Sequence, residues 1–158
     1  MKYKTVNQID TICIDEMNFS QIRFEGGRLT LMLDGAVIKA DNTHNNRFED
    51  VYGAPMELTF CGVTMERFCL AGYKYYDADG KLLQEIPERR LDEAQMKEIM
   101  AKTEGGWVFR LEYSRDGGRC RLIYDTDIQD ETNTYEAEFS YESSIASWER
   151  FTGPVEGK

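Results

Sequence analysis

The sequence predicts a mainly β protein of the α+β class, an antiparallel hairpin and meander sandwich or barrel of about ten strands with one amphipathic helix. Two observations support this fold class. Apolar and polar residues alternate along most of the chain, which is the period of a half-buried strand. Three Asp-Gly pairs, typical of tight hairpin turns, interrupt these runs. Only residues near 92–103 have helical spacing.

The strongest hairpin signal is WVFRLEYSRDGGRCRLIYDT, residues 107–126. Here two alternating runs flank Asp116-Gly117, which predicts a two-residue turn. Such a turn fixes the register, because a shift by one residue would exchange apolar and polar faces. It would set these pairs opposite each other: Tyr113 and Cys120, Leu111 and Leu122, Phe109 and Tyr124, and the charged pair Glu112 and Arg121.

The first half of the chain contains several further β runs. Residues 2–24 hold short runs, and RLTLMLDGAVIKAD (28–41) predicts a hairpin at Asp34-Gly35 with one wholly apolar face. Residues 41–55, rich in Asn and Asp, have no period and predict a long loop that ends at Pro55. The remaining runs of this half are 56–61, 63–70 and a third hairpin around Asp79-Gly80.

The helix has recognisable start and stop signals. Asp92 is a good N-cap, Gln95 three residues later completes a variant of the capping box, and Leu91 is placed to pack against Met96. Gly105-Gly106 is expected to close the C-terminus. After the hairpin of residues 107–126, the chain predicts a polar acidic loop at 125–134 and β runs at 135–141 and 145–151.

The length of 158 residues suits a single domain, 1–158. Residues 28–70 and 107–152 share an order of elements: a hairpin with an Asp-Gly turn, a polar loop, a strand, and a strand containing Glu-Arg-Phe. We interpret these as a possible internal repeat, two related β modules joined by the hairpin and helix at 71–106. The polar loops 41–55 and 125–134 would then be equivalent.

The net charge of −10 disfavours nucleic acid and anionic membranes as partners and makes a basic protein the plausible charged partner. No run has the character of a signal peptide or the length of a transmembrane helix, so we expect a cytoplasmic protein. Its four cysteines lack metal or disulfide spacing, and a reducing compartment suits them. Oligomeric state is left open.

The candidate binding residues are Asp125, Asp127, Asp130, Glu131, His44, Trp107 and Trp148. The acidic group invites a calcium interpretation, but Asp130 occupies the loop position where glycine is needed, so we predict no metal site and no cofactor. His44, the only histidine, has no evident catalytic partners.

Two Glu-Arg pairs, Glu66-Arg67 and Glu149-Arg150, lie in β runs, where neighbouring side chains point to opposite faces. Each Glu would then share a face with Phe68 or Phe151. We interpret these four residues, with Glu112 and Arg121, as structural ion pairs rather than catalytic groups.

Three functions from different classes are consistent with these features. The first is a non-enzymatic interaction protein that binds a protein partner through an acidic face, as an inhibitor or immunity-like protein would. The second is a β protein that holds a small apolar ligand against Trp107 or Trp148. The third is a carboxylate-based hydrolase, which requires two carboxylates in a cleft and at least one raised pKa. The first is preferred.

Overall fold

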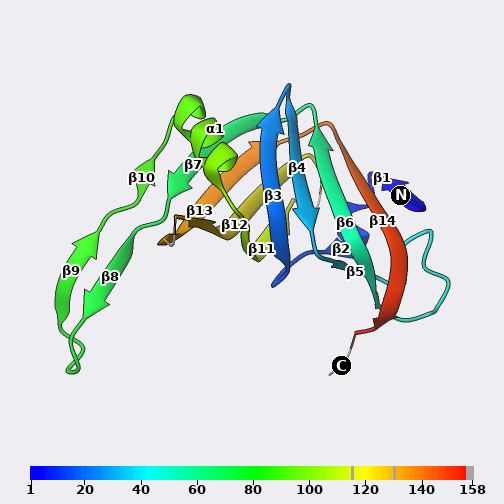
Figure 1. Ribbon diagram of the computed structural model, residues 1–158, viewed down its shortest axis with the longest axis horizontal. Helices are drawn as coiled ribbons and strands as arrows, with labels where there is room; N and C mark the ends of the chain where they lie inside the picture. The colour runs from blue at the N-terminus through cyan, green and yellow to red at the C-terminus, as the bar shows by residue number, and fades with distance from the viewer. Residues whose placement is uncertain (115, 130, 156–158) are drawn as a thin grey trace.

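The computed structural model describes residues 1–114, 116–129 and 131–155. In this part of the chain it shows one 12-stranded antiparallel sheet, a separate 2-stranded antiparallel ribbon and one α-helix (Figure 1). The predicted class, mainly β with one helix, is confirmed. The elements are β1 (Tyr3–Val6), the 3-10 helix η1 (Ile9–Thr11), β2 (Ile12–Cys13), β3 (Asn18–Glu25), β4 (Arg28–Leu33), β5 (Ala36–Ile38), β6 (Val51–Cys61), β7 (Thr64–Leu70), β8 (Tyr73–Tyr76), β9 (Leu82–Ile86), β10 (Arg89–Arg90), α1 (Glu93–Lys102), β11 (Gly106–Tyr113), β12 (Arg119–Ile128), β13 (Glu131–Ser140) and β14 (Ser143–Pro154).

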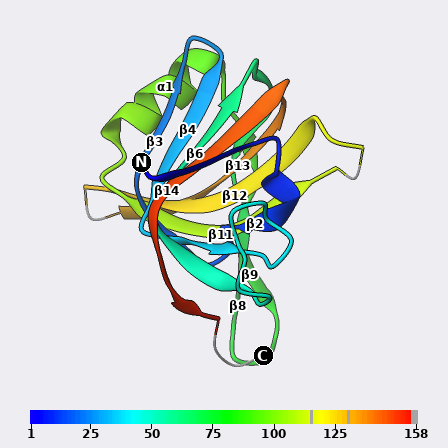
Figure 2. The same cartoon turned by 90° about the vertical axis from the view of Figure 1, so that its right-hand side faces the viewer.

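The large sheet curves so that its two halves face each other. Its strands follow the order β1-β14-β6-β4-β3-β11-β12-β13-β7-β10, while β5 pairs with β6 and β2 pairs with β5. The sheet does not close, because β1 and β10 end this order. In Figure 2, β14, β6 and β4 cross in front of β11 and β12 at a steep angle. Phe60 of β6 and Phe139 of β13 meet between the halves with ring centroids 5.1 Å apart, so the apolar core lies on the concave side.

One long antiparallel ribbon runs through both halves. β6 continues into β7 and β13 into β14, and the two turns lie side by side: Cys61 pairs with Ser143 and Thr64 with Ser140. Gly62 at this bend has φ +65°, and a Cβ there would lie 2.6 Å from the side chain of Glu142. The left-handed backbone conformation therefore favours glycine at this position.

The hairpin of β11 and β12 has most of its predicted register. Three predicted pairs are present: Leu111 with Leu122, Glu112 with Arg121, and Tyr113 with Cys120. The fourth is wrong, because a β-bulge at Phe109 interrupts the ladder and Val108 pairs with Tyr124 instead. The bulge lets Val108 stay fully buried while Phe109 is 48% exposed.

The turn of this hairpin also differs from the prediction. Gly117 N–H donates to the Ser114 carbonyl, and Ser114 N–H donates to the Arg119 carbonyl. The left-handed residues are Gly117 and Gly118, with φ of +78° and +87°, rather than Asp116 and Gly117. A longer loop with two left-handed glycines therefore closes the hairpin in place of a two-residue turn.

The hairpin predicted at Asp34-Gly35 is wrong. β4 and β5 both run along β6 in the same direction, with Leu33 opposite Met56 and Ala36 opposite Gly53. Asp34-Gly35 therefore interrupts two successive strands that run in the same direction, and the chain does not reverse there. The alternation of apolar and polar residues shifts by one position at Asp34-Gly35. A bulge and a two-residue turn both produce such a shift, so the sequence pattern alone did not distinguish them.

The third predicted hairpin is confirmed around Asp79-Gly80. β8 and β9 pair from Tyr73 opposite Ile86 to Tyr76 opposite Leu82. The Asp77 carboxylate accepts hydrogen bonds from the backbone N–H groups of residues 79 and 81, and Gly80 has φ +80°. The side chain accepts hydrogen bonds that a backbone carbonyl would accept in a turn, which is why Asp favours turns.

Helix α1 has the predicted N-terminus. Asp92 accepts a hydrogen bond from Gln95 N–H, and the Gln95 side chain accepts one from Asp92 N–H, so the capping box is complete. Met96 and Met100 are buried, because α1 packs against β3 and β7. The helix covers the end of the molecule where these two strands diverge (Figure 1).

The two polar segments that were interpreted as equivalent loops have different structures. Residues 41–50 form a loop, but β6 begins at Val51, so Pro55 lies inside a strand. Of the predicted loop at 125–134, residues 125–128 and 131–134 are the paired ends of β12 and β13, with Asp125 opposite Thr134 and Asp127 opposite Thr132. The internal repeat itself stays a prediction.

Candidate functional site

Residues 73–86 form a two-stranded arm that projects from the body of the molecule (Figure 1). The arm exposes five large apolar side chains: Tyr73, Tyr75, Tyr76, Leu82 and Leu83, the last of them 67% exposed. Half of the large apolar residues that are exposed in the described chain lie on this one short ribbon. Single exposed apolar residues are ordinary, whereas a cluster of them marks an interaction surface.

The base of the arm is fixed by a close crossing of its two strands. A Cβ on Gly72 would lie 2.5 Å from both Glu88 N and Ile86 O, so only glycine fits there. Beyond this point β8 and β9 pair with each other in a sheet of their own, and Lys74 Nζ lies 3.9 Å from Glu85 Oε1. An isolated two-stranded ribbon is only marginally stable in water, so the apolar side chains do not form a core within the arm.

A cleft of about 520 Å³ lies between the arm and the hairpin end of β12 and β13. We call it the wedge cleft. It is lined by Leu70, Ala71, Gly72, Tyr73, Tyr75, Ile86, Pro87, Thr132, Asn133 and Thr134. The cleft arises because β7 pairs with β13 only as far as Leu70, and the chain then turns away into β8.

Three of the predicted acidic residues adjoin residues that line the wedge cleft, although none of the three lines it. Thr134, which lines the cleft, donates its hydroxyl hydrogen bond to Asp125, and Thr132 donates one to Asp127 over 2.9 Å. Glu131 begins β13 and is exposed. Asp130 lies outside the described residues. The carboxylates thus belong to a paired hairpin end beside the arm.

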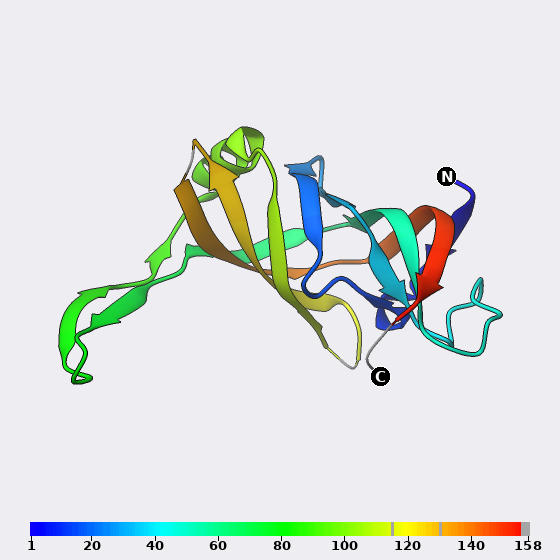
Figure 3. The ribbon, with the colours of Figure 1, turned by 60° about the horizontal axis from the view of Figure 1, so that its bottom comes forward.

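The predicted residues His44 and Trp148 come together elsewhere. Their ring centroids are 6.1 Å apart, and Tyr3 stacks on Trp148 at 5.6 Å. Trp148 is fully buried, and a Cβ on Gly53 would lie only 2.9 Å from its indole ring, so the packing there is tight. His44 Nε2 lies 3.0 Å from the Lys4 carbonyl. The loop that carries His44 and the arm are at opposite ends of the molecule (Figure 3).

Trp107 belongs to neither group. Its indole N–H donates to the Glu16 carbonyl over 3.0 Å, and its ring meets Phe109 edge-on. The seven candidate binding residues therefore do not form one site. The hairpin of the arm was predicted, but its exposure was not, because Tyr73 and Tyr75 alternate like residues of a strand with one buried face.

The Glu66-Arg67 pair differs from its predicted orientation. A bulge in β7 leaves Glu66 without a cross-strand partner, so Glu66 does not share a face with Phe68. Its carboxylate instead lies 2.6 Å from the Arg119 guanidinium. Arg67 pairs with Glu88, and lies 3.7 Å from Glu136. Glu149 and Arg150 are exposed on β14, and neither forms an ion pair within the described ranges.

The charged residues of the outer sheet face form a connected network. Arg121 hydrogen-bonds Glu136 and lies 3.4 Å from Glu112, the pair expected from the hairpin register. The hydrogen bond from Arg121 lowers the pKa of Glu136, and the same contact raises the pKa of Arg121. These charges hold one another in their ionised forms, which is a structural role.

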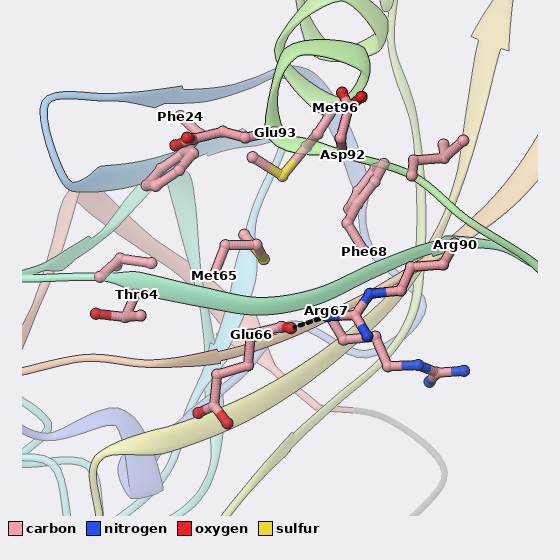
Figure 4. Close-up of a pocket in the computed structure, with 12 residues that line it drawn as sticks. Phe24, Thr64, Met65, Glu66, Arg67, Phe68, Arg90, Asp92, Glu93 and Met96 are labelled. Atoms are coloured by element: carbon pink, nitrogen blue, oxygen red, sulfur yellow. Dashed lines mark hydrogen bonds between the residues drawn. The ribbon is translucent and has the colours of Figure 1, made fainter.

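A second cleft, of about 540 Å³, lies between α1 and β7 (Figure 4). Met65, Phe68 and Met96 point into it, whereas the carboxylate of Glu66 points to the other side of β7. Arg90 Nη2 donates to the Glu66 carbonyl over 2.9 Å. The nearest other carboxylates are those of Asp92, which caps the helix, and Glu93. The cleft therefore has no pair of free carboxylates placed for acid–base chemistry.

Other chemical signatures are also missing from the described residues. The carboxyl groups with a shifted pKa there, Glu98 and Glu136, are both shifted downward by hydrogen bonds from basic side chains. Burial raises the pKa of the Cys120 thiol to about 12, which keeps it protonated and unreactive. No three potential metal-ligating side chains gather in residues 1–114, 116–129 and 131–155.

Comparison with known proteins gives no further guidance. No family model, no curated protein and no solved structure matches this chain. None of the described helices has the length and apolarity needed to cross a membrane. The functional argument therefore rests on the arm and the wedge cleft.

Proposed function

We propose that this protein is a non-enzymatic binding module that engages a basic protein partner through the arm of residues 73–86. The single observation that carries the proposal is the cluster of exposed tyrosine and leucine side chains on a ribbon that projects from the body. Tyrosine is enriched at protein interfaces because it supplies a large contact area together with a polar end. A projecting ribbon can insert into a groove of a partner without rearrangement of the sheet.

The charge of the molecule favours a basic partner. The net charge is −10, and Asp77 and Asp79 stand at the turn of the arm. The acidic hairpin end with Asp127 and Glu131 lies at the other side of the wedge cleft. Apolar contact area flanked by carboxylates is complementary to a surface of apolar residues flanked by Lys and Arg. The four cysteines are all unpaired, which supports a reducing compartment such as the cytoplasm.

The two alternative functions find less support. An apolar-ligand protein needs a cavity beside Trp107 or Trp148, but Trp148 is closely packed and Trp107 bonds to the backbone. A carboxylate hydrolase needs a general acid with a raised pKa. The downward shifts at Glu98 and Glu136 run in the opposite direction.

The test is affinity capture from the native extract with three forms of the protein. The first is wild type, and the second carries Tyr75→Ser and Leu83→Ser on the arm. The third carries Phe48→Ser, which removes an apolar side chain that is 95% exposed in a loop at the far end of the molecule. We expect one basic protein to be retained by wild type and by the Phe48→Ser control and to be lost with the arm variant. Equal retention by all three forms would refute the arm as the binding site, provided that circular dichroism shows the same fold for each.

A further inference from the structure

The edge of β13 beside the arm has backbone groups without a neighbouring strand. Ala71 N–H donates to the Thr134 carbonyl, and this is the last contact before the chain leaves β13. Backbone groups alternate sides along a strand, so the N–H and C=O of Thr132 face the same side as those of Thr134. Beyond Thr134, no strand in the described part of the chain pairs with this side of β13. The position that β7 would continue to occupy is the wedge cleft.

The opposite wall of the wedge cleft is suited to cover an added strand. It consists of Tyr73, Tyr75, Ile86 and Pro87, and the two tyrosine rings meet edge-on with centroids 5.1 Å apart. A strand that adds to a sheet edge gains its affinity from backbone hydrogen bonds and its specificity from side-chain pockets on either side. The aromatic wall supplies the apolar contact, and the edge of β13 supplies the hydrogen bonds.

The charges around the cleft indicate the chemistry of the occupant. Among the described residues no charged side chain lines the cleft, and the carboxylates of Asp125 and Asp127 on β12 accept hydrogen bonds from its lining residues Thr134 and Thr132. The tyrosine faces are also favourable neighbours for a cation. An arginine or lysine in the added strand would therefore meet both carboxylates and aromatic faces.

We propose that the wedge cleft binds an extended, basic segment of the protein partner, which adds to the edge of β13 as a strand. This inference rests on the proposed function and specifies its mode of binding. The segment lies between β13 and the arm, forms backbone hydrogen bonds with Thr132, and directs an Arg or Lys side chain toward Asp127.

The probe is a displayed library of linear ten-residue peptides, selected against the intact protein. We expect the enriched peptides to combine β-branched or aromatic residues with at least one Arg or Lys. The best peptide is then synthesised with a fluorophore, together with a version in which each Arg or Lys is replaced by Gln. The Gln version should bind about tenfold or more weakly, because it loses the charge-assisted contacts. No enrichment, or enrichment of peptides without basic residues, overturns the proposal.

Two substitutions at one position test the strand addition itself. Thr132→Pro removes the N–H that faces the cleft, and leaves the pairing with β12 intact because that N–H points away from β12. Thr132→Val is the matched control, since it keeps the N–H and removes only the hydroxyl that bonds Asp127. We expect Thr132→Pro to weaken peptide binding by about tenfold more than Thr132→Val does. Equal affinities for the two variants would exclude a backbone hydrogen bond at this edge.

The outcomes separate this inference from the proposed function. If Tyr75→Ser with Leu83→Ser abolishes partner capture but Thr132→Pro does not, the arm binds the partner and the strand addition is wrong. If neither variant affects capture, both proposals fail. Analytical ultracentrifugation of the protein alone provides a further check. A dimer that Thr132→Pro dissociates would identify a second copy as the occupant and overturn the assignment to a basic partner.

Discussion

Phe109 and Leu111 stand two residues apart in β11 and have opposite environments. In a regular strand they would share a face. The bulge at Phe109 breaks that relation, so Phe109 is 48% exposed and Leu111 is 8% exposed opposite Leu122. A single irregular residue thus decides which side chain of the strand belongs to the core.

This difference makes the two positions a matched pair for a stability measurement. Leu111→Asp places an unpaired carboxylate in the core and should lower the free energy of unfolding by about 4 kcal/mol or more, which is a large part of the stability of a typical domain. Phe109→Asp places the same group at the exposed bulge and should leave the protein folded. Urea denaturation followed by tryptophan fluorescence compares the two. A cooperative, wild-type-like transition for Leu111→Asp would contradict the register of this hairpin.

Glu136 gives a second measurement at the scale of single residues. Its folded-state pKa is lowered by the hydrogen bond from Arg121, so its ionisation stabilises the folded state above the pKa of the unfolded chain. That stabilisation is lost as the pH falls through the lower, folded-state value. The stability difference between wild type and Glu136→Gln should therefore be largest near neutral pH and shrink below about pH 4.3. A stability difference for Glu136→Gln that stays constant with pH would argue against the ion pair.

At the scale of elements, the arm is separate from the sheet that carries the core. β8 and β9 pair only with each other, and their residues are exposed along nearly their whole length. Function and stability are therefore assigned to different elements.

Removal of the arm tests this separation. Replacing residues 74–85 with Gly-Gly leaves Tyr73 and Ile86 to close a short turn at the base. Because few buried contacts are removed, the free energy of unfolding should change by no more than about 0.5 kcal/mol. Differential scanning calorimetry of the shortened protein measures this. A large loss of stability would mean that the arm supports the body rather than serving a partner.

The elements also show what the sequence could and could not predict. The capping box of α1 and the turn at Asp79-Gly80 depend on local hydrogen bonds, so the sequence predicted both correctly. The hairpin prediction at Asp34-Gly35 was wrong because a bulge and a turn shift the apolar pattern in the same way. Only the pairing with β6 distinguishes the two. The wedge cleft is formed by residues more than forty positions apart, Tyr73 and Thr132 among them, and its shape follows from the divergence of the arm from β13. A local sequence pattern does not predict how these two distant segments diverge.

At the scale of the whole molecule, the excess of acidic residues acts at a distance. The net charge of −10 would attract the proposed basic partner before contact and repel other copies of the same chain. The proposed contact site, the wedge cleft, is lined by apolar and uncharged polar residues. The association rate constant is therefore expected to depend on the net charge, and the dissociation rate constant on the contact site.

The salt dependence of the kinetics distinguishes the two contributions. Raising the ionic strength from about 0.02 M to 0.5 M should lower the association rate constant by about tenfold or more, because electrostatic steering is screened. The arm variant with Tyr75→Ser and Leu83→Ser should instead mainly raise the dissociation rate constant. Surface plasmon resonance with the captured partner resolves both constants. An association rate that is insensitive to salt would remove the charge argument for a basic partner.

The long ribbon of β6–β7 and β13–β14 has a consequence for the synthesis of the protein. β14 pairs with β1 on one side and with β6 on the other, with Trp148 opposite Tyr3 and Met56. When the ribosome has released the first half of the chain, β1 and one edge of β6 still lack β14, which is translated after β13. The large sheet can therefore be completed only after residues 143–154 have emerged, and until then this edge of β6 has no partner strand.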